Sequence, residues 1–249
     1  MLREELVFGP IHSRRLGNSL GINLLPTQGK LCNFDCIYCE CGWNADGRGD
    51  RRLPNAAEFE EMLGSRLAEC AAAQTQIDSI TFSGDGEPTL NPEFSHIIDI
   101  TIALRDRYYP EASVSVLTNA TRIGVDEIFN ALRKVDNPIL KLDAVSDAAA
   151  KRINAPVGHY SVREQVALMK RFEGDFVLQT MFLKAPGFDS AEGLDEWMDI
   201  VRELHPREIM AYTIARPVPA EGLEKYTMEE MSQMLRPLSE EGYNIKIYE

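Results

Sequence analysis

Short runs of β-branched and aromatic residues recur along the chain at fairly even spacing. Six of these runs predict strands, over residues 20–25, 77–82, 113–118, 139–145, 176–183 and 208–214. Between the runs, apolar residues return with the period of a helix. Strands and helices are therefore expected to alternate along the whole chain.

Several of the predicted helices carry start signals. Asn91 followed by Pro92 predicts a helix start with proline at its first position, and Ser190 predicts another. Thr227 with Glu230 is typical of a capping box. Two apolar stripes predict the buried faces of helices, and they consist of Phe59, Met62, Leu63, Leu67 and Cys70, and of Leu194, Trp197, Met198, Val201 and Leu204.

This alternation predicts an α/β protein with a parallel sheet covered by helices, either doubly wound or barrel-like. Six strand–helix units are too few to close an eight-unit barrel. In both arrangements, the reactive residues gather at the carboxyl ends of the strands. The residues that directly follow each predicted strand are therefore the first candidates for chemistry.

Composition excludes several classes. The 249 residues are 44% hydrophobic and 26% charged, which is typical of a globular chain and not of disordered, collagen-like or coiled-coil proteins. The formal charge of −13 opposes binding to nucleic acid or anionic lipid. The first thirty residues lack a signal sequence and no run reaches a membrane span, so a cytoplasmic protein is expected.

Four of the five cysteines lie within ten residues, as Cys32, Cys36, Cys39 and Cys41, and the fifth is Cys70. Thiols crowded in this way indicate a metal site and not a disulfide framework. The spacing CxxxCxxC supplies three thiolates after the first predicted strand. A closed zinc site would need Cys41 as its fourth ligand, whereas a four-iron cluster held by three cysteines keeps one iron open to a small molecule.

This motif, with Tyr38 directly before the last cysteine, resembles the hallmark of the radical S-adenosylmethionine (SAM) superfamily. The resemblance implies that Cys32, Cys36 and Cys39 hold a [4Fe-4S] cluster. It also implies that SAM chelates the open iron through its amino and carboxylate groups, and that Tyr38 packs near the adenine.

Further segments after the predicted strands resemble cofactor-binding positions of the same superfamily. Ser83-Gly84-Asp85-Gly86-Glu87-Pro88 resembles its GGE segment, with Asp85 in place of the first glycine, which implies contacts to the methionine end of SAM. Thr118 and Asn119 resemble residues that point toward the cofactor. Lys141 and Asp143 share one face of the fourth predicted strand. The resemblance makes Asp143 the candidate for the ribose hydroxyls and Lys141 its partner or a substrate contact.

Nearly the full length is similar to a narrower group, the radical SAM enzymes that build the wyosine base of transfer RNA. The segments that carry this similarity are residues 13–23, SGDGEPTL, KLDA, Asn154-Ala155-Pro156 and Arg216-Pro217. The wyosine enzymes of archaea also use cysteines before the hallmark motif, and others carry a flavodoxin domain. No cysteine precedes Cys32 here. With the net charge, this difference predicts that transfer RNA is not the substrate.

The remaining candidates favour simpler roles. Cys70 belongs to an apolar stripe and is expected in the core. Cys41 is expected to be a spare thiol and not a ligand. The four histidines share no spacing that indicates a metal site. Arg48, Arg51 and Arg52 form a basic run beside the cysteine loop, which is expected to be solvated or to contact an acidic electron donor or an anionic substrate.

Together these features predict a partial (β/α)6 barrel that forms one domain over residues 1–249, with neither an auxiliary-cluster domain nor a flavodoxin domain. The expected function is that of a radical SAM enzyme that cleaves SAM to a 5′-deoxyadenosyl radical, with reduced flavodoxin or ferredoxin as electron donor. Alternatives are a tRNA-modifying enzyme and a non-catalytic cluster-binding module. The expected substrate is a small molecule or a partner protein, bound by Lys141, Gln179, Tyr212 and Arg216.

Overall fold

The structure, a computed structural model, describes residues 5–46 and 52–249. The chain separates into two compact units, each assembled from separate segments. The first unit comprises Met1–Cys32, Asn44–Thr118 and Arg122–Pro138, and the second comprises Asn33–Trp43, Asn119–Thr121 and Ile139–Glu249. The single domain expected over residues 1–249 stays a prediction.

Four strands of the first unit lie in the order β1-β2-β3-β4, with β1 antiparallel to β2 and the others parallel. The elements of this unit are β1 (Val7–Ser13), β2 (Gly17–Ile22), η1 (Asn44–Asp46), α1 (Ala56–Ala72), β3 (Ser79–Phe82), η2 (Pro88–Leu90), α2 (Phe94–Tyr108), β4 (Ser113–Thr118), α3 (Asp126–Leu132) and the first residues of β5 (Asn137–Lys141).

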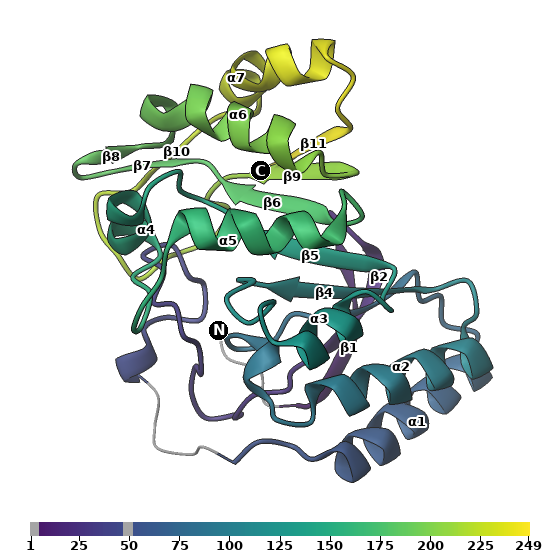
Figure 1. Ribbon diagram of the computed structural model, residues 1–249. Coiled ribbons are helices and arrows are strands. Elements are labelled where there is room, and N and C mark those ends of the chain that lie inside the picture. Colours follow the sequence, from purple (N-terminus) through teal and green to yellow (C-terminus); the bar gives the residue numbers. More distant parts are fainter. Residues whose placement is uncertain (1–4, 47–51) are drawn as a thin grey trace. The chain divides into compact units, whose positions relative to one another are not determined.

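Helices α1 and α2 lie side by side in Figure 1 and pack against this sheet through aromatic side chains. Phe82 of β3 contacts Phe59 of α1 and Phe94 of α2, with ring centroids 6.3 and 6.2 Å apart. All three rings are fully buried. Burial of each such side chain stabilises the fold by about 1.5–3 kcal/mol. The helices are therefore held on one face of the sheet by its apolar positions.

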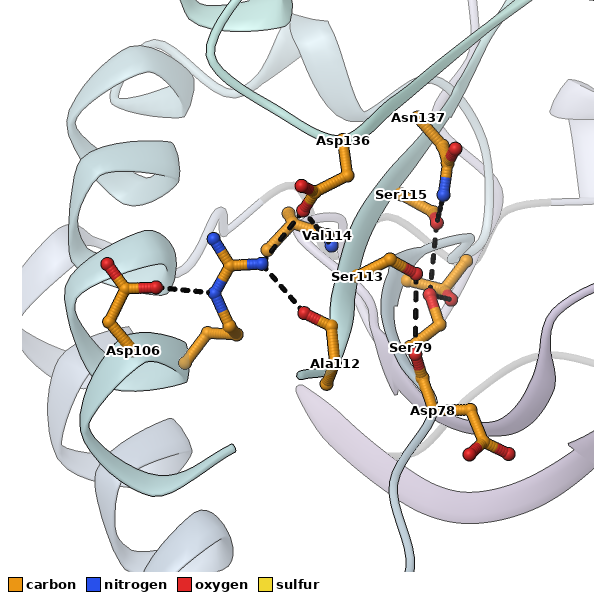
Figure 2. Close-up of polar contacts among 11 residues, drawn as sticks. Asp78, Ser79, Asp106, Ala112, Ser113, Val114, Ser115, Asp136 and Asn137 are labelled. Carbon is orange, nitrogen blue, oxygen red and sulfur yellow. Dashed lines mark hydrogen bonds and ion pairs between the residues drawn. The ribbon is translucent and has the colours of Figure 1, made fainter. Parts of the chain in front are cut away.

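The other face of these strands carries small polar residues. The hydroxyls of Ser79 and Ser115 are hydrogen-bonded at 3.0 Å, and Asn137 donates to Ser115 at 3.0 Å, as Figure 2 shows. Hydroxyls that satisfy one another in this way remove the cost of burying polar groups. Directly before Ser79, the Asp78 carboxylate accepts the backbone N–H of Asn18 at 2.7 Å. That hydrogen bond, with one from Gln76, holds the pKa of Asp78 below its ordinary value.

The second unit contains parallel strands in the order β5-β6-β9-β11, and a small antiparallel sheet in the order β10-β7-β8. The further elements of this unit are α4 (Asp147–Ile153), α5 (Val162–Met169), η3 (Lys170–Phe172), β6 (Val177–Met181), β7 (Leu183–Ala185), β8 (Phe188–Asp189), η4 (Ser190–Gly193), α6 (Leu194–Leu204), β9 (Glu208–Tyr212), β10 (Glu224–Lys225), α7 (Met228–Glu240) and β11 (Ile245–Tyr248).

All six predicted strands are present, as β2, β3, β4, β5, β6 and β9. Strand β5 ends at Lys141, so Asp143 lies two residues beyond the strand and not within it. The run over residues 176–183 is divided between β6 and β7. The strands that the pattern did not predict are β1, β7, β8, β10 and β11.

Three details of the predicted helices are wrong. Helix α2 begins at Phe94 and not at Pro92, because Asn91 starts a turn in which its Oδ1 accepts the Glu93 N–H at 2.9 Å and its carbonyl accepts the Phe94 N–H at 3.1 Å. Ser190 begins a short 3-10 helix, and α6 starts at Leu194. Met62 is 44% exposed and lies outside the buried stripe of α1. The capping box of Thr227 and Glu230 is confirmed.

No helix in the described part of the chain has both the length and the apolar character that crossing a membrane requires.

Candidate active site

The segment that leads into the cysteine motif pairs with the glycine-rich loop of the first unit. Leu31, directly before Cys32, forms a parallel bridge with Gly86. Its N–H donates to the Asp85 carbonyl, and its own carbonyl accepts from the Glu87 N–H, both at 3.0 Å. Two segments that the sequence marks as cofactor-binding candidates are thus brought together through their backbones.

Glycine is required at two positions of this loop. A Cβ atom at Gly84 would lie 2.1 Å from Oδ1 of Asn23, and one at Gly86 would lie 1.8 Å from the Leu31 carbonyl oxygen. Gly86 also has a φ of +138°, a conformation that L side chains rarely adopt. Asn23 further supports the loop by accepting the Asp85 N–H at 3.0 Å. The two glycines therefore allow backbones to approach where a side chain would prevent it.

The Glu87 side chain anchors this loop to the end of β4. Its Oε1 accepts the hydroxyls of Thr89 and Thr118, each at 2.6 Å, and the N–H of Thr89 at 3.1 Å. Glu87 and Thr118 are both buried. Glu87 and Thr118, both predicted as cofactor contacts, are therefore hydrogen-bonded to one another and hold the loop in place.

In the second unit, Asn119 is bonded to the loop between the first two motif cysteines. Its Nδ2 donates to Oδ1 of Asn33 at 2.7 Å, and Asn33 donates to the Thr121 hydroxyl at 2.6 Å. That hydroxyl donates back to Oδ1 of Asn119 at 2.7 Å. This closed ring of hydrogen bonds fixes the conformation of the motif at Asn33.

One buried amide joins three candidate residues of the second unit. Nδ2 of Asn154 lies 3.4 Å from Sγ of Cys36, and 2.8 Å from both the Tyr38 hydroxyl and Oδ2 of Asp143. The Tyr38 hydroxyl also donates to Asp143. The second motif cysteine, the motif aromatic and the carboxylate after β5 therefore form one cluster around Asn154.

Burial controls the ionisation of this cluster. It raises the pKa of the Cys36 thiol to about 11, although Lys141 and the hydrogen bonds from Asn154 and Tyr38 act in the opposite direction. It also raises the pKa of Tyr38 well above its ordinary value, and the neighbouring Asp143 adds to that shift. Tyr38 is therefore a neutral hydrogen-bond donor at neutral pH.

Lys141 lies against the same cluster. Its Nζ is 3.6 Å from Oδ1 of Asp143 and donates to the hydroxyl of Tyr212. It also lies over the rings of Tyr38 and Tyr212, at 5.3 and 4.9 Å from their centroids. Burial lowers the pKa of Lys141, but Asp143, Tyr212 and Cys36 together raise it above its ordinary value. The predicted proximity of Lys141 and Asp143 is confirmed, and the ammonium is charged.

The remaining candidates for substrate contact differ in their burial. Gln179 is buried on β6, in register with Lys141 on β5. Arg216 was expected to line the interior, but its side chain is 60% exposed and pairs with Glu40 at 2.7 Å. An arginine is rarely buried without a partner, and Arg216 meets its partner at the surface, on a loop after the last strand of the predicted set. Of the basic run, Arg48 and Arg51 lie outside the described residues, and Arg52 pairs with Glu58.

The cysteines are distributed between the two units. Cys32 belongs to the first, where its carbonyl accepts from Asn44 at 3.1 Å, and Cys36 and Cys39 belong to the second. None of the five cysteines is in a disulfide, and Cys70 is buried as expected. Across residues 5–46 and 52–249, no three Cys, His, Asp or Glu side chains gather as closely as a single metal ion requires.

The chemistry of the motif fits an iron-sulfur cluster. Cluster ligands must be thiolates, and N–H groups directed at their sulfur atoms stabilise the bound state. Asn154 directs such a group at Cys36, and the thiol loses its proton on binding metal. The three thiols of the motif and the amide beside Cys36 are therefore of the types that an iron-sulfur cluster requires.

The comparison with protein families agrees with this geometry. The sequence profile of the radical SAM superfamily matches residues 28–205, which include the cysteine motif, the glycine-rich loop, Asp143 and Asn154. The chain belongs to the radical SAM superfamily. The α/β class with mostly parallel strands, predicted as a partial barrel, is confirmed by the folds of other members.

Curated relatives extend beyond this chain. The UPF0026 protein MJ1312 of Methanocaldococcus jannaschii is 29% identical over 244 residues, which cover 94% of this chain and 71% of that protein. A UPF0026 protein of Helicobacter pylori is 28% identical over 222 residues, covering 87% of this chain and 69% of the relative. Both alignments therefore extend over most of this chain.

Solved structures of radical SAM proteins share the fold. A radical SAM methyltransferase from Sphaerobacter thermophilus has a TM-score of 0.69 at 16% identity, covering 92% of this chain and 66% of that one. SuiB from Streptococcus suis, bound to SAM, scores 0.66 at 17% identity, covering 93% and 52%. TYW1 with a lysine-pyruvate adduct scores 0.62 at 14% identity, covering 89% and 73%. This chain spans about half the length of SuiB.

Sequence reasoning missed two site residues. The sequence indicates Asn154 only through the family resemblance of Asn154-Ala155-Pro156, and it gives Asn33 no separate role. The signal for Asn33 was its place inside the CxxxCxxC motif. No local pattern links Asn154 to the motif, because it reaches Cys36 from 118 positions away in the chain.

Proposed function

We propose that this protein is a radical SAM enzyme that uses a [4Fe-4S] cluster on Cys32, Cys36 and Cys39 to cleave SAM. The observation that carries the proposal is the contact of Asn154 with Cys36, Tyr38 and Asp143. A predicted cluster ligand and two predicted SAM contacts all lie within hydrogen-bond distance of the same buried amide. A non-catalytic cluster module would need only the cysteine, not the tyrosine and the carboxylate beside it.

When bound, the cluster and SAM supply one-electron cleavage of the sulfonium, which gives methionine and a 5′-deoxyadenosyl radical that abstracts hydrogen from the substrate. The protein has to hold these groups and exclude water. Asn154 donates to the Cys36 sulfur, and we assign the hydrogen-bonded pair of Tyr38 and Asp143 to the nucleoside part of SAM. The loop at Gly86 presents backbone groups to its methionine part.

Electron delivery requires a partner, for which we propose reduced flavodoxin or ferredoxin. We also propose that transfer RNA is not the substrate. Affinity for a nucleic-acid backbone grows with the number of phosphates that basic residues neutralise. A chain with 26 basic and 39 acidic residues opposes that binding.

The direct test of this function is the cleavage of SAM by anaerobically reconstituted protein reduced with dithionite. We expect 5′-deoxyadenosine and methionine in equal amounts, measured by liquid chromatography with mass spectrometry. The Cys36→Ala protein, treated in the same way, is the control for cleavage by unbound iron. A cluster-loaded protein that forms no 5′-deoxyadenosine would instead favour the non-catalytic module.

Asp143 tests the assignment of the SAM contacts. The Asp143→Asn variant is expected to keep its iron and to bind SAM at least tenfold more weakly, a loss of about 1.4 kcal/mol. The reason is that the amide removes the negative charge at the centre of the buried cluster. Isothermal titration calorimetry with the cluster-loaded variant measures the affinity.

The matched control for this variant is Asp147→Asn. Asp147 is an exposed carboxylate that accepts the Val162 N–H at 2.7 Å in the same unit, and its change is expected to leave SAM affinity unaltered. If Asp143→Asn binds SAM as tightly as the wild type, Asp143 has a role in folding and not in cofactor binding.

A further inference from the structure

Gln179 carries a buried hydrogen-bond donor without an acceptor. Gln179 is 4% exposed, and its Nε2 has no hydrogen-bond partner among the described residues. Gln179 pairs in register with Lys141 on β5 and with Met210 on β9, so the three side chains share one face of the sheet. A buried N–H without a partner destabilises a fold, and such a group in a native protein requires an explanation.

Lys141, on the same face, also has donors in excess. A charged ammonium has three N–H groups, and within the described residues it makes one hydrogen bond, to Tyr212. Asp143 lies at 3.6 Å, beyond hydrogen-bond distance. The Asp143 oxygens already accept from Tyr38, Asn154 and the N–H of Met181. Two neighbouring side chains therefore offer more donors than the cluster can accept.

The geometry points to Lys141 and Gln179 as the binding site for a carboxylate group of the substrate, which makes the substrate a small organic acid. This inference rests on the proposed function and names its substrate class. A carboxylate only accepts hydrogen bonds and has two oxygens, one for the ammonium and one for the amide. The rings of Tyr38 and Tyr212 lie beside Nζ, and Gln179 is buried, so the attraction acts in surroundings poorer in water than the surface.

The charge balance favours a carboxylate over a phosphate. Asp143 neutralises part of the single positive charge of Lys141. Beside this ion pair a carboxylate adds one negative charge and a phosphate dianion adds two, so the carboxylate costs less to bury next to the neutral donor of Gln179.

Protein stability gives a first test that requires neither cofactor nor substrate. The variant Gln179→Met keeps the side-chain volume and removes the unpartnered donor, so its melting temperature is expected to equal or exceed that of the wild type. The matched control is Gln165→Met. Gln165 is also 4% exposed, but its Nε2 donates to the Ala120 carbonyl at 2.7 Å, so this variant is expected to melt roughly 3 °C lower or more. A comparable loss in Gln179→Met would show a structural role and overturn the inference.

Ligand binding gives the second test. The probes are acetate, benzoate and N-acetylglycine, each compared with its uncharged amide, titrated into the cluster-loaded protein with and without SAM by ligand-observed NMR. The wild type and Gln165→Met are expected to bind at least one acid tenfold or more tightly than its amide. Gln179→Met and Lys141→Met are expected to lose that preference. Equal binding of all acids and amides by the wild type, or an unchanged preference in Gln179→Met, would overturn the inference.

These measurements separate the inference from the function on which it rests. A protein that forms 5′-deoxyadenosine but does not prefer acids contradicts the carboxylate site alone. A protein that prefers acids through Gln179 but never cleaves SAM retains the site and contradicts the proposed enzyme.

Discussion

Alanine in place of Cys32, Cys36 or Cys39 is expected to leave the reconstituted protein with roughly a tenth of the wild-type iron or less. The wild type is expected to hold about four iron and four sulfide ions per chain. Two thiolates cannot retain a cluster that three hold, because the affinity comes from all ligands acting together. Iron and sulfide assays, with the electron paramagnetic resonance signal of the reduced cluster, measure the effect.

Two further cysteines of the chain serve as controls for this series. Cys41→Ala and Cys70→Ala are expected to keep the full iron content, since Cys70 is buried in the core and Cys41 follows the motif. Loss of metal in Cys41→Ala would make Cys41 a fourth ligand. The open-iron mechanism would then be abandoned for a closed four-cysteine site of the kind that zinc uses.

Gly86→Ala is expected to be the most damaging substitution outside the cysteines. The added Cβ would lie 1.8 Å from the Leu31 carbonyl oxygen, at a φ of +138°. Backbone atoms cannot rotate away as a side chain can, so the bridge between Leu31 and Gly86 has to open. We expect a loss of roughly 3 kcal/mol of stability and no measurable SAM binding, because the loop ahead of Cys32 moves with it.

Gly158→Ala is the matched control for this substitution. Gly158 also has a positive φ, of +90°, but a Cβ there would meet nothing within 4 Å. The Gly158→Ala variant is expected to lose only about 1 kcal/mol of stability, because alanine disfavours a positive φ, and to bind SAM normally. Thermal unfolding and calorimetry compare the two. Similar melting temperatures for both variants would contradict the claim that the Leu31 contact decides the effect.

Much of the fold could be predicted because its signals are local. A buried parallel strand is a short apolar run, and an amphipathic helix repeats its apolar residues every three or four positions. The strands β7, β8 and β10 have only two or three residues each, too few for any periodic signal. Strand β1 contains Gly9 and Pro10 and shifts register between Phe8 and Ile11, which obscures its alternation.

The membership of the radical SAM superfamily could be predicted from the sequence alone, because the residues of a CxxxCxxC motif lie within one loop and their spacing is a local property. It also predicted that Lys141 and Asp143 lie close together, since they are two positions apart, and their charged atoms are 3.6 Å apart. The contact of Asn154 with Cys36 and the alignment of Gln179 with Lys141 arise from the three-dimensional fold. Those contacts depend on strand register and on where each segment crosses another, and the residues between them carry no pattern that encodes the distance.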